Sequence, residues 1–409
     1  VFVVGDPFRR CHRTVFFHPV PVVVIFHPAG LKRRILVDPV IRSVGQIPAL
    51  FCNLLAVFQK IVFLSIDIAE RELEILKKID YENGYSLYIG IPFCPTTCLY
   101  CSFTSYSLAA NRSKVDLYLD ALVKEMRFVA DRMKGRRLDT VYFGGGTPTT
   151  LEPEQLDRLL NELEADFDMS TVKELTVEAG RPDSVTAQKL EVLKKHGVDR
   201  ISINPQTMND KTLEIIGRRH SATQVEEAFK LARSVGFDNI NMDIILGLPG
   251  EGINELRYTL DKIKELKPES LTVHSLAIKR AAALNIWREK YEDLKFENSD
   301  ETVSLAQKYA GDIGCMPYYM YRQKNMAGNL ENVGYSVPGK ECIYNILIME
   351  EKQTIIAMGA GASTKAVFDA DQPNPRIERV ENVKDLTSYI SRIDEMIERK
   401  RLFFDNNML

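Results

Sequence analysis

The sequence has little net charge and few cysteines, and each shortage narrows the classes of protein it can belong to. Its 53 Lys and Arg residues nearly balance its 56 Asp and Glu residues, which leaves a net charge of -3. No basic excess therefore points to nucleic acid or an anionic membrane as a partner. Seven cysteines in 409 residues do not make a disulfide framework, which is typical of short secreted domains. A reducing cytoplasm fits this composition best.

Residues 1–68 differ from the rest of the chain and stay unassigned. Apolar runs such as residues 14–30 are broken by proline. Residues 47–64 approach membrane-spanning length, but Gln59 and Lys60 lie in their interior, whereas a bilayer span needs about 20 consecutive apolar residues. We therefore expect a buried or amphipathic helix here, and no membrane span. No signal-peptide pattern is evident.

From residue 86 onward, short runs suited to strands alternate with longer stretches in which apolar residues return at helical spacing. The predicted strands cover residues 86–91, 139–143, 174–178, 200–203, 239–246 and 270–276. The predicted helices between them cover residues 114–133, 152–167, 184–197, 223–236 and 253–268. Strands separated by helices pair in parallel through crossovers, because a tight turn cannot join parallel neighbours. We predict an α/β fold: a partial (β/α)6 barrel over residues 69–280, and a smaller α+β C-terminal domain over residues 281–409 that covers the substrate.

The residues suited to chemistry lie where the predicted strands end. Three cysteines follow the first strand, a glycine triplet at 144–146 follows the second, Glu178 ends the third, Gln206 follows the fourth and Asp243 lies within the fifth. Barrels of this kind carry out their chemistry at the carboxyl ends of the strands. These residues should therefore meet at one rim.

Cys94, Cys98 and Cys101 form a CxxxCxxC pattern within eight positions. Three thiolates in a tight loop suit a [4Fe-4S] cluster, whose irons prefer sulfur ligands. The fourth cysteine of a ferredoxin is missing, so one iron keeps an open position for a substrate or cosubstrate. The alternatives are a structural zinc site or three unrelated buried cysteines. A zinc site normally needs four protein ligands, and the next histidine, His196, is far along the chain.

The cysteine pattern, with Tyr100 before the last cysteine and the GGGTPT loop at 144–149, resembles the radical S-adenosylmethionine (SAM) superfamily. In that family SAM binds the open iron, and one electron from the cluster splits it into methionine and a 5′-deoxyadenosyl radical. The resemblance implies a [4Fe-4S] cluster and SAM as cofactors, which carry the difficult chemistry while the protein positions them.

Within the superfamily, residues 88–103, the GGGTPT loop, the GRRH segment at 217–220 and the DIILGLPGE segment at 243–251 resemble the oxygen-independent coproporphyrinogen III oxidase group. Residues 320–365 resemble its HemZ-type coproporphyrinogen dehydrogenase branch. The resemblance covers roughly residue 69 to the C-terminus. The chain is short at its N-terminus for that branch, from which we expect a fragment or a divergent start.

The resemblance also implies which residues contact SAM. They are Tyr88, Tyr100, Gly144, Gly145, Gly146, Thr147, Glu178, Gln206, Arg218, Asp243 and, through its backbone, Ala277. Glycines let backbone groups approach a ligand closely; carboxylates suit ribose hydroxyls, and a guanidinium suits a carboxylate. The alternatives are an ordinary turn, a strand aromatic or a solvated strand end. Asn204 and Pro205 stand before Gln206 where the family usually has glycine.

Candidate substrate residues lie in the C-terminal part: Tyr321, Arg322, Gln323 and Lys324. A substrate with several propionates needs cations, and a large ring needs aromatic walls. The alternative is a solvated, charged strand edge. We expect His274 to pack or form hydrogen bonds near the barrel rim.

The function that the resemblance implies is oxygen-independent oxidative decarboxylation of coproporphyrinogen III to protoporphyrinogen IX in porphyrin and heme biosynthesis. The partners would be the porphyrinogen and an electron donor and acceptor that the sequence does not identify, with no nucleic acid and a monomeric chain. The alternatives are a HemW-like heme chaperone, a radical SAM enzyme that methylates or opens heme, and an inactive chain that still binds the cluster. A HemW-type chain should carry a heme-binding HNxxY-like segment, but the comparable place, residues 343–349, has Tyr344 where histidine is expected. Similar folds do not settle function.

Overall fold

The computed structural model describes residues 12–17, 20–25, 34–37, 49–101, 103–276, 298–321, 332–372 and 375–407, with side chains from residue 63 onward. The chain divides into two compact units, residues 1–63 and 64–409. The first contains an antiparallel sheet of β1 (His12–Phe17), β2 (Val20–Ile25) and β3 (Arg34–Val37). Helix α1 (Ala49–Leu76) crosses the boundary between the two units in the sequence. None of the described helices is long and apolar enough to cross a membrane.

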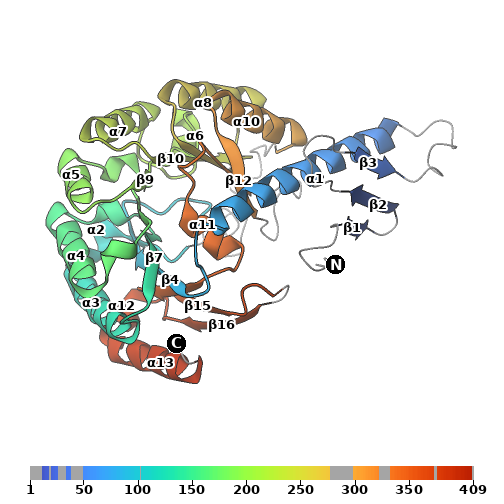
Figure 1. Ribbon diagram of the computed structural model, residues 1–409. Coiled ribbons are helices and arrows are strands. Elements are labelled where there is room, and N and C mark those ends of the chain that lie inside the picture. The colour runs from blue at the N-terminus through green and yellow to red at the C-terminus, as the bar shows by residue number, and fades with distance from the viewer. Residues whose placement is uncertain are drawn as a thin grey trace. The chain divides into compact units, whose positions relative to one another are not determined.

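The second unit is built around an eleven-stranded sheet (Figure 1). Six neighbouring strands are parallel: β4 (Gly84–Ile91), β7 (Arg137–Gly145), β8 (Glu174–Glu178), β9 (Arg200–Ser202), β10 (Ile240–Leu246) and β11 (Ser270–Ser275). They are the six strands that the sequence predicts, and no end differs by more than about two residues, the usual uncertainty of such boundaries. The sheet does not close on itself, so the predicted partial barrel is confirmed.

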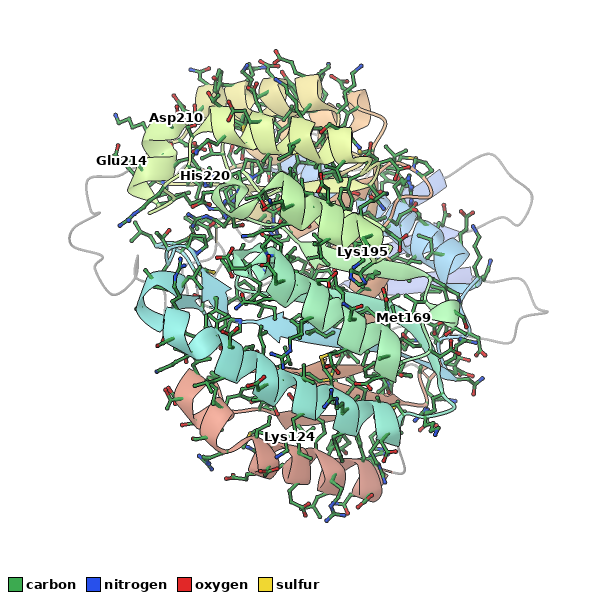
Figure 2. The ribbon with its side chains drawn as sticks, turned by 90° about the vertical axis from the view of Figure 1, so that its left-hand side faces the viewer. Lys124, Met169, Lys195, Asp210, Glu214 and His220 are labelled. Atoms are coloured by element: carbon green, nitrogen blue, oxygen red, sulfur yellow. The ribbon has the colours of Figure 1, made fainter. Side chains whose placement is uncertain are left out.

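Helices connect the parallel strands and cover their outer face (Figure 2). These helices are α3 (Val115–Arg132), α4 (Pro153–Asp166), α5 (Ala187–Lys195), α6 (Asp210–Ile215), α7 (Ala222–Val235) and α8 (Ile253–Leu266). Local sequence sets their ends. For example, α7 begins with a capping box between Ser221 and Gln224 and ends at Gly236, whose φ is 101°. A glycine adopts that left-handed conformation without steric cost.

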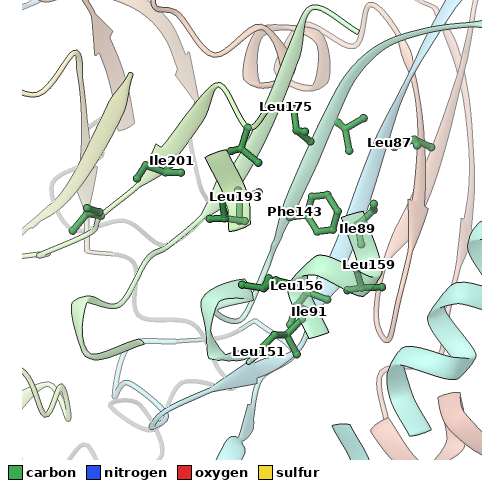
Figure 3. Packing of buried hydrophobic residues seen from close by; sticks show 14 of the residues in the cluster. Leu87, Ile89, Ile91, Phe143, Leu151, Leu156, Leu159, Leu175, Leu193 and Ile201 are labelled. Atoms are coloured by element: carbon green, nitrogen blue, oxygen red, sulfur yellow. The ribbon is translucent and has the colours of Figure 1, made fainter. Parts of the chain in front are cut away.

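Each barrel strand has one apolar and one polar face. On β4, the side chains of Leu87, Ile89 and Ile91 are fully buried and belong to the same core as the covering helices (Figure 3). Because successive side chains in a strand point to opposite faces, Ser86 and Tyr88 face the barrel interior. The other parallel strands repeat this alternation. The outer face therefore provides the hydrophobic core, and the inner face is left for polar groups.

The C-terminal residues extend the same sheet at both edges. Strands β13 (Asn332–Ser336) and β12 (Met316–Tyr321) continue it beyond β11. At the other edge, β14 (Thr354–Met358) pairs in parallel with β4 and is followed by β15 (Ser363–Phe368) and β16 (Arg376–Glu381). The sequence suggested a separate C-terminal domain, whereas these strands share the barrel's sheet. The suggested boundary at residue 280 lies outside the described residues.

The remaining elements are short or C-terminal. The C-terminal helices are α10 (Asp300–Asp312), α11 (Ile343–Met349), α12 (Leu386–Ser391) and α13 (Ile393–Asn407). The short elements are β5 (Phe93–Cys94), β6 (Tyr106–Ser107), α2 (Leu108–Asn111) and the 3-10 turns Arg112–Lys114, Pro148–Thr150, Met169–Thr171 and Pro182–Ser184.

A buried ion pair attaches the C-terminal helix to the barrel. The Lys400 ammonium on α13 donates to Glu125 Oε1 on α3 at 2.6 Å, and both side chains are almost completely buried. Glu125 also accepts hydrogen bonds from Asn382 Nδ2, the Tyr389 hydroxyl and the Gly359 amide at 2.6 to 2.9 Å. A buried charge needs this full set of partners, because each unmet hydrogen bond costs desolvation energy.

The Lys400→Met substitution should therefore destabilise the unit by about 3–5 kcal/mol, since it leaves the Glu125 carboxylate buried without its cation. The measurement is the free energy of unfolding in urea. The control is Arg401→Met at the next position, where the guanidinium makes only solvent-exposed ion pairs and the unfolding midpoint should hardly move. Equal small effects for the two variants would contradict the assigned role of the ion pair.

Candidate functional site

The three clustered cysteines lie on one loop at the carboxyl ends of the barrel strands. Cys94, Cys98 and Cys101 are free, partly exposed thiols that line a cavity of about 340 Å³. Neighbouring elements hold the loop in place: the Thr96 hydroxyl donates to the Gly217 carbonyl at 2.9 Å, and the Leu99 amide donates to Ile216 at 3.0 Å. The fold thus brings three sulfurs to the same cavity.

Most of the residues predicted to bind cofactor or substrate meet at this cavity. Its lining includes Cys94, Cys98, Tyr100, Cys101, Gly145, Gly146, Thr147, Glu178, Gln206, Arg218, Asp243 and Tyr321. Tyr88 and Gly144 lie directly behind them, because a Cβ atom on Gly144 would approach the Tyr142 ring to 2.8 Å and the Tyr88 ring to 3.3 Å. Ala277, Arg322, Gln323 and Lys324 lie outside the described residues.

The arrangement of the thiols bears on the choice between zinc and an iron–sulfur cluster. Among the described residues, no three His, Cys, Asp or Glu side chains are grouped closely enough to bind a single metal ion. A [4Fe-4S] cluster has no such requirement, because each cysteine binds a different iron and the sulfurs surround the cluster. Three thiols around a cavity fit the cluster better than they fit a zinc ion.

The glycine loop after β7 is bonded to the segment that leads into the cysteines. The Gly146 amide donates to the Ile91 carbonyl and the Thr147 amide to the Phe93 carbonyl, both at 2.8 Å. A Cβ atom on Gly146 would lie 2.6 Å from the Phe93 oxygen, and Gly145 has a φ of 105°. Only glycine allows this close approach.

Thr147 connects this loop directly to the thiols, because its hydroxyl donates to Cys94 Sγ at 3.5 Å. Burial raises the pKa of the Cys94 thiol to about 11, although the Thr147 hydrogen bond opposes this shift. A bound iron would displace the thiol proton, since cysteine binds metals as the thiolate.

Two buried guanidinium groups flank the cysteine loop. Arg181 donates to the Thr96 hydroxyl at 3.0 Å and to Cys98 Sγ at 3.7 Å, while Asp183 accepts two hydrogen bonds from its other edge. Arg218 donates to the Asn204 carbonyl. These cations would offset the negative charge of cluster thiolates. The sequence analysis overlooked Arg181, although its place three residues after the end of β8 puts it at the predicted rim.

Glu178 presents a carboxyl group with a raised pKa to the cavity. Its Oε1 accepts a hydrogen bond from the Tyr142 hydroxyl at 2.6 Å. Burial raises the pKa of Glu178 to about 7, and the nearby charge of Asp243 acts in the same direction, while the Tyr142 hydrogen bond opposes it. Glu178 therefore changes charge close to neutral pH.

Asp243 behaves differently because it has polar partners. Its carboxylate accepts from Asn241 Nδ2 at 2.7 Å and lies 3.7 Å from His274 Nε2. Burial acts to raise the pKa of Asp243, but His274 and the amide outweigh it, so the pKa is lowered. His274 Nδ1 in turn lies 3.1 Å from the Tyr321 hydroxyl, which confirms the expected hydrogen-bonding role of His274 at the rim.

Gln206 and Arg218 supply buried polar atoms that have no partner within the described chain. Gln206 has a φ of 66°, and its backbone pairs with Asp243 and Ile245, which turns the side chain into the cavity. Its Oε1 and the Nε of Arg218 are buried without hydrogen bonds. Unmet buried polar groups are costly, so their convergence on one cavity fits a polar cofactor such as SAM.

Asn204, which stands where the family usually has glycine, takes part in this geometry. Its side-chain oxygen accepts from the Asp243 amide at 3.2 Å, and its carbonyl accepts from Arg218. Asn204 therefore connects the end of β9 to Asp243 on β10 and to Arg218.

Comparisons with known proteins identify the family of this chain. The family model of the radical SAM superfamily matches residues 88–263. The chain is 44% identical over 343 residues to the oxygen-independent coproporphyrinogen-III oxidase-like protein HemZ of Bacillus subtilis, a match that covers 83% of this chain and 68% of HemZ. It is 40% identical over 194 residues to the heme chaperone HemW of the same organism, covering 47% of this chain and 50% of HemW.

Among solved structures, the coproporphyrinogen III oxidase HemN of Escherichia coli is similar with a TM-score of 0.61 and 23% identity. The match covers 79% of this chain and 72% of HemN. At this identity the similarity shows a shared fold.

The iron-binding role of the loop predicts that Cys98→Ala protein will retain little iron and sulfide after anaerobic reconstitution, because the cluster then loses one of only three protein ligands. The readout is iron and acid-labile sulfide per chain. Cys315→Ala is the control, since this buried thiol lies outside the cavity lining. Full iron content in the Cys98 variant would contradict the assignment.

The raised pKa of Glu178 predicts a pH-dependent contribution to stability. The folded state binds this proton more tightly than the unfolded state, whose pKa is near the ordinary 4.5. Its stabilising contribution is thus complete below pH 4.5 and is lost as pH rises through 7. In the cluster-free protein, unfolding free energies measured from pH 5 to 8 should fall more steeply for wild type than for Glu178→Gln. Identical slopes would show that the carboxyl titrates normally.

Proposed function

Because the chain belongs to the radical SAM superfamily and, within it, to the oxygen-independent coproporphyrinogen III oxidase-like proteins, we propose that it converts two propionates of coproporphyrinogen III to vinyl groups. The product is protoporphyrinogen IX. Proteins of this superfamily use a [4Fe-4S] cluster and SAM. The observation that carries the proposal is the length of the HemZ match, because 343 residues cannot fit within the 88–263 region and must include β12 and β13. These strands contribute Tyr319, Tyr321 and Asn332 to the cavity.

The reaction removes one hydrogen atom, one electron and CO2 from each propionate. When bound, the cluster and SAM supply the 5′-deoxyadenosyl radical that takes the hydrogen atom, and an external one-electron acceptor takes the electron. The chain supplies position, charge and exclusion of water.

The residues at the carboxyl ends of the barrel strands would hold the cofactors. Cys94, Cys98 and Cys101 would bind three irons, and the backbone at Gly145 and Gly146 would approach SAM closely. Arg218 suits the methionyl carboxylate.

Two carboxyl groups would recognise the ribose. Glu178 and Asp243 suit its hydroxyls. His274 helps to keep Asp243 ionised, which makes Asp243 the more constant hydrogen-bond acceptor of the two near neutral pH.

Three aromatic rings line the cavity where a porphyrinogen would bind: Tyr142, Tyr319 and Tyr321. Behind the cavity wall, Tyr142 stacks on Tyr344 of α11 with ring centroids 4.6 Å apart and on Tyr88 at 6.3 Å. Tyr319 and Tyr321 are parallel at 6.4 Å. Flat, apolar ring faces suit a large macrocycle, and the hydroxyl groups suit its polar edge.

A heme chaperone is the second candidate, and the 40% identity to HemW favours it. At the position where a heme ligand is expected, however, the Tyr344 ring is buried between other tyrosines. It is occupied in packing and does not face the cavity as an axial ligand would. The free thiols of the described cysteines suit the reducing cytoplasm that we propose as the compartment.

The first test is anaerobic turnover. Cluster-loaded protein is mixed with SAM, a reductant and coproporphyrinogen III, and 5′-deoxyadenosine, CO2 and protoporphyrin are quantified. We expect all three products from wild type and none from Cys98→Ala. Slow formation of 5′-deoxyadenosine with unchanged porphyrinogen, together with heme binding, would replace the proposed activity with the chaperone function.

A further inference from the structure

Arg200 is a charged residue on the inner face of the barrel that the proposed cofactor site does not use. It begins β9, lines the cavity and is only 1% exposed. Ser202 is in register with Glu178, and Arg200 is in register with Thr176. Two residues of a strand span roughly 7 Å, so Arg200 lies that much deeper in the barrel than Glu178.

The guanidinium group of Arg200 has no hydrogen-bond partner in the described part of the chain. Its Nε is fully buried and unpaired. The two arginines beside the cysteine loop differ from Arg200, because Arg181 donates to the Thr96 hydroxyl and Arg218 donates to the Asn204 carbonyl. A buried cation without hydrogen bonds is among the most costly arrangements in a protein.

Glu174 is a buried acid that attracts Arg200, but its oxygens already accept hydrogen bonds from the start of helix α11. Its Oε2 accepts from the Ile343 amide at 2.6 Å. Its Oε1 accepts from the Cys342 thiol at 3.3 Å and the Tyr344 amide at 3.4 Å. Glu174 thus caps the helix start, and it attracts Arg200 only through space.

Glu178 also attracts Arg200 through space, because the Arg200 charge acts to lower the pKa of Glu178. Its described hydrogen bond, however, is from the Tyr142 hydroxyl. Neither carboxyl group accepts a described hydrogen bond from Arg200, so the guanidinium keeps its hydrogen-bonding capacity for a ligand.

We propose that Arg200 binds one carboxylate of the substrate, a propionate-type group, through a two-pronged contact at the floor of the cavity. The guanidinium is always charged, and its planar fork matches a carboxylate. Buried polar groups are normally hydrogen-bonded, and exceptions are typical of functional positions. The inference rests on the proposed function and adds a specificity-determining residue to it, independent of the candidates in residues 322–324.

The SAM carboxylate is the other possible source of the same chemistry. Under the proposed function, the SAM carboxylate binds close to the cysteine loop, where Arg218 lies near Cys98 and Tyr100. Arg200 has no described contact with that loop and lies deeper. A carboxylate that reaches it comes from a second molecule bound below SAM.

The test uses cluster-loaded protein under anaerobic conditions and compares Arg200→Met and Arg200→Lys with wild type. Thr176→Val is the matched control, because this neighbour on β8 alters the same layer without removing the cation. The readouts are the Kd of fluorescent coproporphyrin III, the Kd of SAM, the KM for coproporphyrinogen III and the thermal midpoint.

Arg200→Met should weaken coproporphyrin III binding roughly ten- to a hundredfold, as expected for a lost hydrogen bond to a charged group. The Kd of Arg200→Lys for coproporphyrin III should lie between the values for wild type and Arg200→Met. Lysine keeps the positive charge but cannot donate two parallel hydrogen bonds to one carboxylate. KM should rise with coproporphyrin Kd, while SAM binding stays at the wild-type value. The thermal midpoint reports whether each variant folds.

Each other outcome overturns the inference in a distinguishable way. Weaker SAM binding with unchanged porphyrin binding would assign Arg200 to SAM. A lower thermal midpoint with unchanged porphyrin binding would make it a structural cation. If wild type binds coproporphyrin III and Arg200→Met binds it equally well, the inference fails alone. If wild type does not bind coproporphyrin III, the proposed function fails and the inference fails with it.

Discussion

The two-residue periodicity of six parallel strands is the constraint on which the structure depends. Leu87, Ile89 and Ile91 point to the helices, so Ser86 and Tyr88 must point inward. The same rule on β8 and β9 sends Glu178 and Arg200 into the interior. A shift of one residue in any strand would exchange the hydrophobic core for the polar site. Stability and chemistry therefore occupy opposite faces of one sheet.

The signals that were local in the sequence predicted the fold correctly, and most of the candidate site residues meet at one cavity. The strands were visible as apolar runs, the helices as 3.6-residue periodicity, and the cysteine loop as a spacing pattern. Parallel pairing then predicted that Glu178, Gln206 and Asp243 would meet at one rim. The unoccupied oxygen of Gln206 and the opposite pKa shifts of Glu178 and Asp243 required the folded neighbours, because burial and partners come from other strands.

What the sequence missed depends on long-range pairing. A charged residue at the start of a predicted strand, such as Arg200, is usually exposed to solvent. Its burial in the structure depends on neighbours that are distant in the sequence. Arg181 reads as a loop residue until the cysteine loop lies against it. The pairing of β14 with β4 joins segments from opposite ends of the unit, and no local pattern records which edge of a sheet a distant strand will join. The C-terminal part was therefore taken for a separate domain.

The pairing of β14 with β4 also has a consequence for how the chain is made. A ribosome releases the N-terminal residues first, so β4 and the cysteine loop emerge long before residues 354–358, which cover the second edge of β4. Until then that edge offers unpaired backbone groups to other chains. A nascent chain that stopped after β13 would already contain the three cysteines of the loop and all six parallel barrel strands. It would still leave the edge of β4 unpaired, directly before the loop that binds iron.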